Sequence, residues 1–291
     1  MEIFHKTIPC MNSCIDLVLP EMNDVAGGEL ALKIEKEALA LEKLLSRFDS
    51  QAEVFKVNEA AFREEIPVSD RLWKILQDCF RFNEWTSGYF DIGLGYFKNP
   101  VKRNQGSLDC GMKDIILNPE RKSIKFSTDT VSLDFGAIGK GLVLRETEKI
   151  LTSFSVKDCF ISFGGSSVLT RGTHPYGPNW PLSMRNISGS MPVFYLNDSC
   201  VSFSGALTEN ILGNKYHIVN PKNLQIEENN RISFVQCSCP VIAEVLSTTL
   251  LLVNLQEADA IVAKFNPLKA LVFNKNVNKE ISIIYSYGHT D

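Results

Sequence analysis

The chain has 291 residues, of which 44% are hydrophobic and 22% are charged, a balance typical of folded globular proteins. A formal net charge of −4, with no cluster of Lys and Arg, argues against nucleic-acid binding. No hydrophobic run approaches the roughly 18 residues that a membrane span needs, and the charged N-terminus is not typical of a signal peptide. We therefore expect a cytoplasmic protein without a transmembrane segment, or an exported one if its N-terminus has been trimmed.

Hydrophobic periodicity and turn residues predict the elements in chain order. Strands are expected over residues 15–19, 115–117, 123–126, 131–134, 159–163, 192–196, 200–203, 216–219, 232–237, 270–273 and 281–285, and helices over residues 29–48, 69–85, 142–151, 242–253 and 256–265. Residues 91–111 are glycine-rich and are expected to form a loop. Strands mixed with separate helices, without a regular βαβ alternation, predict an α+β fold in one large domain over residues 1–291.

Eight cysteines are scattered along the chain, and no two of them form a Cys-x-x-Cys pair. This spacing favours reduced, buried thiols over a disulfide framework.

The segment Leu133 to Gly141 (LDFGAIGKG) is the most informative motif. A predicted strand ends at Asp134, a glycine turn containing Lys140 follows, and a helix comes next. Backbone N–H groups at such a junction can approach an anion closely. The spacing matches neither the P-loop nor the Rossmann fingerprint. A strand-to-helix connection that uses glycine for geometry alone is therefore the open alternative.

Other strand ends are rich in small or polar residues, namely residues 163–167, 202–205 and 217–221. Each alone is more typical of a turn, or of a structural histidine, than of a site. Four such ends, counting the glycine motif, could converge on one ligand.

Glu244, Ser247 and Thr248 fall on the first turns of a predicted helix. The i, i+4 spacing places Glu244 and Thr248 on one helix face, and all three residues offer the oxygen ligands that Mg²⁺ prefers. The alternative is an ordinary helix start, with a carboxylate near the positive end of the helix dipole.

In their order, these pieces resemble one family, the FAD:protein FMN transferases (ApbE family). The matching segments are residues 11–13, 46–50 with Asn58, 87–91, 133–141, 162–165, 204–205, 217–221 and 243–248. The resemblance covers nearly the whole chain. It implies a mixed or antiparallel β core with flanking helices and a flavin cleft.

The resemblance also implies a function. Members bind FAD and Mg²⁺, split the FAD pyrophosphate, and attach FMN through a phosphoester to a threonine or serine of an acceptor protein. The residues that fall at FAD positions are Met11, Phe48, Tyr89, Phe90, Asp91, Asp134, Lys140, His217 and Val219. Ala137, through its carbonyl, falls at a metal position with Glu244, Ser247 and Thr248. Lys140 and His217 are the expected catalytic residues.

Several positions depart from the family pattern. Glu244 stands where an aspartate is usual, while Ser247 and Arg145 stand where many members have an acidic residue. These changes keep two alternatives open: a Mg²⁺-dependent FAD pyrophosphatase that releases FMN and AMP, and a non-enzymatic FAD-binding protein.

Overall fold

The computed structural model describes residues 2–98, 110–184, 191–205, 218–227, 230–276 and 280–288. The chain divides into two compact units, which we describe separately. Unit 1 comprises Met1–Leu41, Ile138–Gly213 and Asn229–Asp291, and unit 2 comprises Glu42–Ala137 and Asn214–Glu228. The predicted α+β class is confirmed, whereas the single domain over residues 1–291 stays a prediction.

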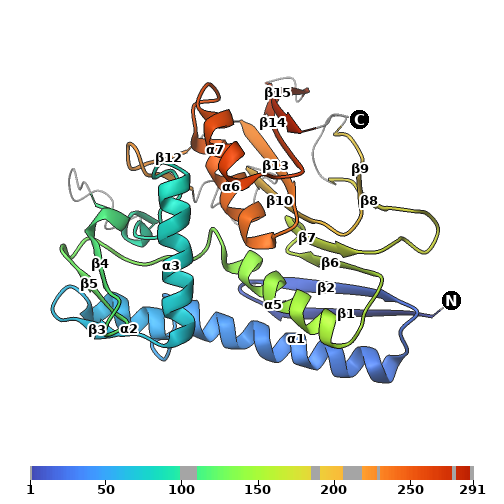
Figure 1. Ribbon diagram of the computed structural model, residues 1–291, viewed down its shortest axis with the longest axis horizontal. Coiled ribbons are helices and arrows are strands. Elements are labelled where there is room, and N and C mark those ends of the chain that lie inside the picture. The colour runs from blue at the N-terminus through green and yellow to red at the C-terminus, as the bar shows by residue number, and fades with distance from the viewer. Residues whose placement is uncertain are drawn as a thin grey trace. The chain divides into compact units, whose positions relative to one another are not determined.

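Unit 1 is built on an eight-stranded sheet in the order β1-β2-β6-β7-β10-β13-β14-β15, in which every neighbouring pair is antiparallel (Figure 1). The strands are β1 (Ile3–Cys10), β2 (Ser13–Pro20), β6 (Cys159–Phe163), β7 (Ser167–Arg171), β10 (Cys200–Gly205), β13 (Arg231–Cys237), β14 (Lys269–Lys275) and β15 (Ile281–Gly288). A separate hairpin pairs β8 (Trp180–Leu182) with β9 (Phe194–Leu196). Its Phe194 ring stacks on Phe234 of β13, with 3.9 Å between centroids, so the hairpin shares the core of the sheet.

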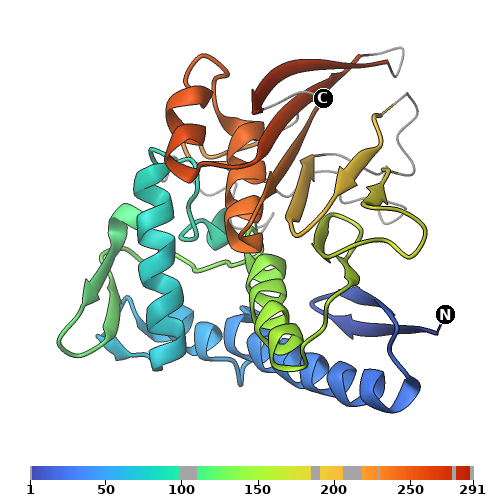
Figure 2. The ribbon, with the colours of Figure 1, turned by 45° about the vertical axis from the view of Figure 1, so that its right-hand side comes forward.

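The helices of unit 1 are α5 (Gly139–Ser153), α6 (Pro240–Leu252) and α7 (Ala258–Phe265), and α1 (Asp24–Leu45) begins in this unit. Helix α6 packs on β10 and β13 and is buried along most of its length. Figure 2 shows the first turn of α5 meeting α6, where Gly141 allows the two backbones to approach closely. A Cβ on Gly141 would lie 2.7 Å from the Pro240 carbonyl oxygen and 2.8 Å from Cγ of Glu244. The contact therefore requires glycine.

The Gly141→Ala variant is expected to be destabilised by about 1–3 kcal/mol, because α5 and α6 would have to separate to admit the methyl group. Gly28→Ala in α1 is the matched control, since a Cβ there meets nothing within 4 Å. That control is expected to gain about 0.5–1 kcal/mol from helix propensity. Chemical denaturation of both variants measures the difference, and equal stabilities would show that the close approach is not required.

Unit 2 contains α2 (Glu53–Ala60), α3 (Asp70–Trp85), the 3₁₀ helices η1 (Gly95–Lys98) and η2 (Met112–Asp114), and the strands β3 (Ile66–Pro67), β4 (Ile115–Asn118), β5 (Ser123–Phe126), β11 (Val219–Asn220) and β12 (Gln225–Ile226). The strands form an antiparallel sheet in the order β3-β5-β4 and a hairpin of β11 with β12. Ser69 caps α3 by accepting a hydrogen bond from the Leu72 N–H at 3.2 Å.

The predicted strand over residues 131–134 is wrong. The N–H and carbonyl of Leu133 both bond to the Asn58 side chain, at 2.7 and 3.1 Å, so a side chain takes the place of a neighbouring strand. In the described part of the chain, the neighbours of Leu133 make only a short parallel bridge with residues 92–95, in which the N–H groups of Ser132 and Asp134 donate to the carbonyl oxygens of Gly93 and Ile92 at 3.1 and 2.8 Å. The helix predicted over residues 29–48 begins earlier, at Asp24, and ends at Leu45. The sequence analysis missed β1, α2, β3, β7, β8 and β12.

All eight cysteines lie in the described residues, and none forms a disulfide. Burial raises the pKa of the Cys159 and Cys237 thiols to about 12, and it raises the pKa of Cys200 as well. Thiols with such pKa values carry almost no thiolate at neutral pH and are poor nucleophiles. These three cysteines therefore act as core residues.

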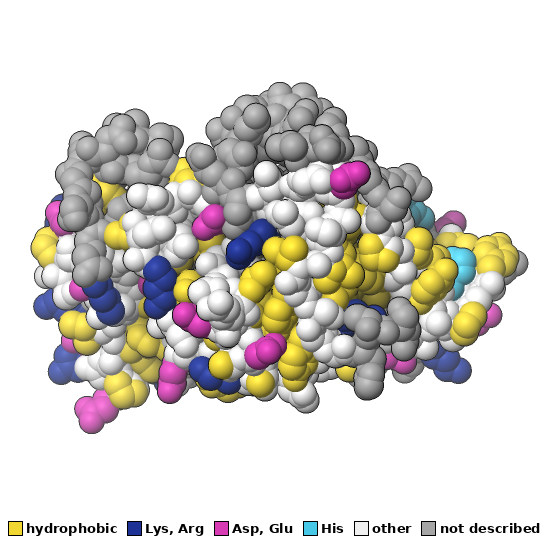
Figure 3. Space-filling view, turned by 90° about the horizontal axis from the view of Figure 1, so that it is seen from above, with side chains coloured by type: hydrophobic (Ala, Val, Ile, Leu, Met, Phe, Trp, Pro, Cys, Tyr) yellow, Lys and Arg dark blue, Asp and Glu magenta, His cyan; other side chains and the backbone are white. Residues whose placement is uncertain are grey.

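No helix among the described residues is both long and apolar enough to cross a membrane. On the face shown in Figure 3, the described basic and acidic side chains lie interspersed and neither sign forms a continuous field.

Candidate functional site

Three glycine-rich or tightly turned segments of unit 1 lie together. The β1–β2 turn places Met11 and Asn12 in the left-handed region, with φ values of 51° and 56°. A Cβ on Gly139, at the start of α5, would lie 3.3 Å from Sδ of Met11. Gly164, with a φ of 61°, follows β6, and a Cβ there would lie 2.5 Å from Oγ of Ser13. The β1–β2 turn, the first turn of α5 and the β6–β7 turn thus form one surface, on which Gly139 and Gly164 allow close contact with the β1–β2 turn.

Lys140 places a cation on this surface. It is the second residue of α5, and its Nζ donates a short hydrogen bond to Oγ of Ser166 in the β6–β7 turn. A lysine near the positive end of a helix dipole is unfavourable by itself, whereas an anion there is stabilised by both charges. The first turn of α5 is therefore a suitable binding position for a phosphate group.

Glu244 lies on the first turns of α6 and is only 6% exposed. Its Oε1 accepts a short hydrogen bond from Oγ of Ser167, which directly follows Ser166 in the chain. Its Oε2 accepts no hydrogen bond from the residues that the structure describes. A buried carboxylate with a free oxygen is available to a cation.

A network of hydroxyl groups continues from Glu244. Oγ of Ser247 lies 2.9 Å from Oγ of both Ser202 and Ser204, and Ser204 lies 3.4 Å from Oγ1 of Thr248. Ser233 supports the cluster by donating to the carbonyl oxygen of Ser247 at 2.6 Å. The structure therefore joins the hydroxyl groups of Ser247 and Thr248 through Ser204, and Ser247 also donates to the backbone carbonyl oxygen of Glu244 at 3.1 Å, whereas the Glu244 carboxylate bonds to Ser167. It adds three serines from β10 and β13 that the sequence analysis did not assign to a metal site.

This donor set can be tested against Mg²⁺. No group of three or more His, Cys, Asp and Glu residues that could hold a metal occurs in the described ranges. One carboxylate oxygen and the hydroxyl groups of Ser247 and Thr248 are all hard oxygen donors. Mg²⁺ commonly uses one or two carboxylates and completes its shell with water and substrate phosphates. The residues present fit a weak Mg²⁺ site that depends on a phosphate ligand.

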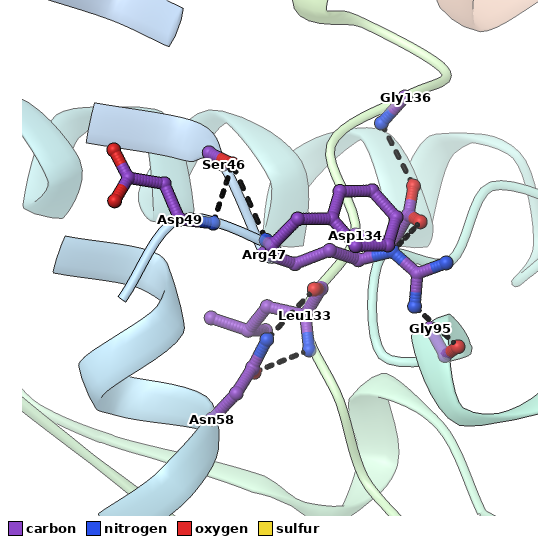
Figure 4. A network of polar contacts seen from close by, with 9 residues as sticks. Ser46, Arg47, Asp49, Asn58, Gly95, Leu133, Asp134 and Gly136 are labelled. Carbon is purple, nitrogen blue, oxygen red and sulfur yellow. Dashed lines mark hydrogen bonds and ion pairs between the residues drawn. The ribbon is translucent and has the colours of Figure 1, made fainter. Parts of the chain in front are cut away.

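Unit 2 contains a second polar network, shown in Figure 4. Nε of Arg47 lies 2.9 Å from Oδ2 of Asp134, and Oδ1 of Asp134 accepts the Gly136 N–H at 2.9 Å. The guanidinium group also donates from Nη1 to the Gly95 carbonyl oxygen at 2.8 Å and lies over the Phe48 ring, 4.5 Å from its centroid. The sequence analysis did not single out Arg47, although two of its partners are expected FAD contacts.

The segment Tyr89 to Asp91 lies at the end of α3. Phe90 is 2% exposed and packs edge-on against Phe82, so its ring is part of the core and is not open to a flat ligand. An FAD contact from Phe90 would therefore come from its backbone. The Tyr89 ring, in contrast, is partly exposed and lies under Nζ of Lys222, 5.1 Å from the ring centroid.

Asp91 uses its carboxylate within the protein. Its oxygens accept N–H groups of Gly93 at 2.7 Å and Met112 at 2.9 Å, which fixes the two ends of the loop after α3. Burial raises the pKa of Asp91, and these hydrogen bonds oppose the rise. The arrangement is that of a structural carboxylate, and a contact with FAD stays a prediction.

The remaining predicted site residues are less constrained by the structure. Val219 is buried in β11, and His217 lies outside the described residues. Ala137 is the last residue of the first segment of unit 2, and its role as a metal ligand stays a prediction.

Comparisons with known proteins identify the family of this chain. The model of the ApbE family matches residues 11–272. The chain is 23% identical over 259 residues to the FAD:protein FMN transferase of Chlamydia muridarum, covering 82% of this chain and 80% of that protein. It is 20% identical over 271 residues to the FAD:protein FMN transferase of Escherichia coli K12, covering 84% of this chain and 77% of that protein.

Solved structures share the fold. The flavin transferase ApbE from Vibrio cholerae superposes with a TM-score of 0.80 at 16% identity, covering 98% of this chain and 97% of that one. The ApbE protein of Thermotoga maritima superposes with a TM-score of 0.78 at 17% identity and covers 97% of both chains. With the family model matching nearly the whole sequence and the fold shared throughout, this chain belongs to the ApbE family.

Proposed function

We propose that this protein is an FAD:protein FMN transferase that uses Mg²⁺ and modifies a threonine or serine of an acceptor protein. One observation carries the proposal. Two consecutive serines, Ser166 and Ser167, hold Lys140 and Glu244 respectively. A cation of α5 suited to a phosphate and a carboxylate of α6 suited to a metal are thereby held by neighbouring residues at the start of β7 in unit 1.

The proposed chemistry is phosphoryl transfer. The hydroxyl oxygen of the acceptor forms a bond to the FMN phosphorus of FAD, the bond from that phosphorus to the AMP oxygen breaks, and the hydroxyl proton leaves to solvent or to AMP. Lys140 and the N–H groups of the glycine turn stabilise the charge that develops on the phosphate oxygens. His217 is the proposed acid or base, because the ordinary pKa of histidine lies near neutrality.

Mg²⁺ would be held by Glu244, with Ser247 and Thr248 as further proposed ligands from unit 1, and it would neutralise charge on the two phosphates of FAD. The residues of the chain have a separate task. Lys140 binds and orients the phosphates, and the buried position of Glu244 fixes its carboxylate before the substrate arrives.

A specific observation favours the non-enzymatic alternative. Oε1 of Glu244 already accepts a hydrogen bond from Ser167, and the hydroxyl of Ser247 is already bonded to two other serines. If these bonds persist when FAD binds, the metal would have few ligands from the protein. The FAD pyrophosphatase alternative needs the same site, with water in place of the acceptor hydroxyl.

Product analysis separates the three functions. The protein is incubated with FAD, Mg²⁺ and a candidate acceptor protein, and AMP, free FMN and the acceptor mass are followed, with EDTA as the control. A transferase releases AMP and adds FMN to the acceptor. A pyrophosphatase releases AMP together with free FMN. FAD binding without any AMP would support the non-enzymatic function and contradict the proposal.

A further inference from the structure

We propose that Arg47 is a positioning residue for FAD, which holds the Phe48 ring and the Asp134 carboxylate in their binding arrangement. The inference rests on the proposed function, because Phe48 and Asp134 are expected FAD contacts through the family resemblance. Arg47 contacts both of them with a single guanidinium group, through the ring face of Phe48 and through Oδ2 of Asp134. All three residues belong to unit 2.

The Phe48 ring needs support if it is to stack on a ligand. Its exposed fraction is 74%, so little of its surface is packed against the protein. Its backbone is held by Ser46, whose Oγ accepts the N–H groups of Phe48 at 3.2 Å and of Asp49 at 3.1 Å. The guanidinium group over the ring restricts the side chain as well. Arg47 thereby lowers the entropy that the ring loses when FAD binds.

The Asp134 carboxylate presents a different problem. It begins the glycine turn whose N–H groups are expected to approach the FAD phosphates, and a negative charge there repels them. Arg47 supplies the compensating positive charge, and both side chains are shielded from water, with exposures of 19% and 11%. Arg47 thus allows a carboxylate to order the turn, through the Gly136 N–H, without weakening anion binding.

The geometry requires arginine in particular. Nε lies 2.9 Å from Oδ2 of Asp134, an ion pair without a hydrogen bond, while Nη1 donates to the Gly95 carbonyl oxygen at 2.8 Å, so the planar group connects two loops of unit 2 (Figure 4). A lysine offers a single charged nitrogen and cannot keep both contacts and the stacking on Phe48.

The test compares FAD dissociation constants, measured by calorimetry, for wild type, Arg47→Ala and Arg47→Lys. Arg47→Ala is expected to raise Kd about tenfold, with Arg47→Lys between it and wild type. Where AMP release is measurable, KM for FAD should rise while kcat changes by less than about threefold, since Arg47 acts on ground-state binding.

The matched control is Arg81→Ala, because Arg81 also pairs with an aspartate, Asp78 at 2.8 Å, and lies over aromatic rings that are not expected FAD contacts. Its Kd should equal that of wild type.

A double-mutant cycle with Asp134→Asn tests the mechanism. If Arg47 acts by neutralising Asp134, Arg47→Ala should raise the Kd for FAD by a clearly smaller factor in the Asp134→Asn background than in wild type. This background also removes the carboxylate charge that Arg47 pairs with, so Asp134→Asn and the double variant still measure the effect of losing Arg47 on Kd if Arg47→Ala alone does not fold.

Two results would overturn the proposal. One is an Arg47→Ala variant that melts at a lower temperature but binds FAD as wild type does, which indicates a purely structural role. The other is a cycle in which the effects of Arg47→Ala and Asp134→Asn on FAD binding simply add, which shows that Arg47 does not act through Asp134. If wild type itself does not bind FAD, the proposed function fails, and that outcome is distinct from both.

Discussion

The Lys140→Ala variant is expected to bind FAD more weakly by about 1.5–3 kcal/mol, which corresponds to roughly a 10- to 150-fold rise in Kd. The ammonium group lies near the N-terminus of α5, beside the glycine turn, and a charge-assisted hydrogen bond to a pyrophosphate oxygen would be lost. Fluorescence titration or calorimetry of FAD measures the change. Lys140 is half-buried and bonds only to Ser166 among the described residues, so the fold should persist.

Lys149→Ala is the control for this experiment. Lys149 lies on the same helix, is 66% exposed, and pairs with Glu146 at 2.8 Å. Its removal changes the net charge by the same amount without touching the glycine turn. Equal FAD affinity for wild type, Lys140→Ala and Lys149→Ala would contradict the phosphate-binding role and favour a connection that uses glycine for geometry alone.

Glu244→Gln is expected to weaken Mg²⁺ binding in the presence of FAD by at least about 10- to 100-fold. Removing a residue that only hydrogen-bonds to a metal ligand already lowers metal affinity by about 10- to 100-fold. Glu244 is the only carboxylate of this cluster among the described residues, so its loss should have at least this effect. The amide keeps the shape of the side chain and can still accept the hydrogen bond from Ser167, so the packing of α6 should be retained. Calorimetric titration of Mg²⁺ with and without FAD measures the effect.

The wild-type titrations also test the origin of the metal affinity. Mg²⁺ should bind weakly to the protein alone and more tightly with FAD, because phosphate oxygens supply the missing ligands. Mg²⁺ affinity that is indifferent to FAD, or equal in wild type and Glu244→Gln, would contradict the metal site and favour the non-enzymatic function.

The sequence predicts this fold well where an element carries its own hydrophobic pattern. The strands β5 and β6 have the predicted bounds, and α3 (Asp70–Trp85) begins one residue after the predicted helix start and ends at its predicted end. It fails where a distant side chain decides the backbone, as at Leu133, whose polar groups bond to Asn58. The strand β1 was missed because Lys6 interrupts the alternation of its buried residues Phe4, Ile8 and Cys10.

The candidate site was predictable to a similar degree. Lys140, Glu244 and Thr248 lie in motifs with recognisable spacing, and the structure links the backbone carbonyl of Glu244 to Thr248 through the hydroxyl groups of Ser247 and Ser204. Lone serines such as Ser233 carry no pattern that would assign them to it. Arg47 lies inside a motif segment, but its partner Asp134 belongs to another motif far along the chain. The available signal for this pair was that one motif contains a cation, Arg47, and another contains a carboxylate, Asp134.

The central claim, transfer of FMN from FAD to a protein hydroxyl, is tested most directly by locating the product. The protein is incubated with FAD, Mg²⁺ and a cell extract that serves as the source of acceptors. Denatured proteins are then separated, and those that carry covalent flavin are detected by fluorescence and sequenced by mass spectrometry. The account predicts FMN in phosphoester linkage to a threonine or serine of another protein, lost with Lys140→Ala and with EDTA. AMP and free FMN without any flavin-labelled protein would contradict it.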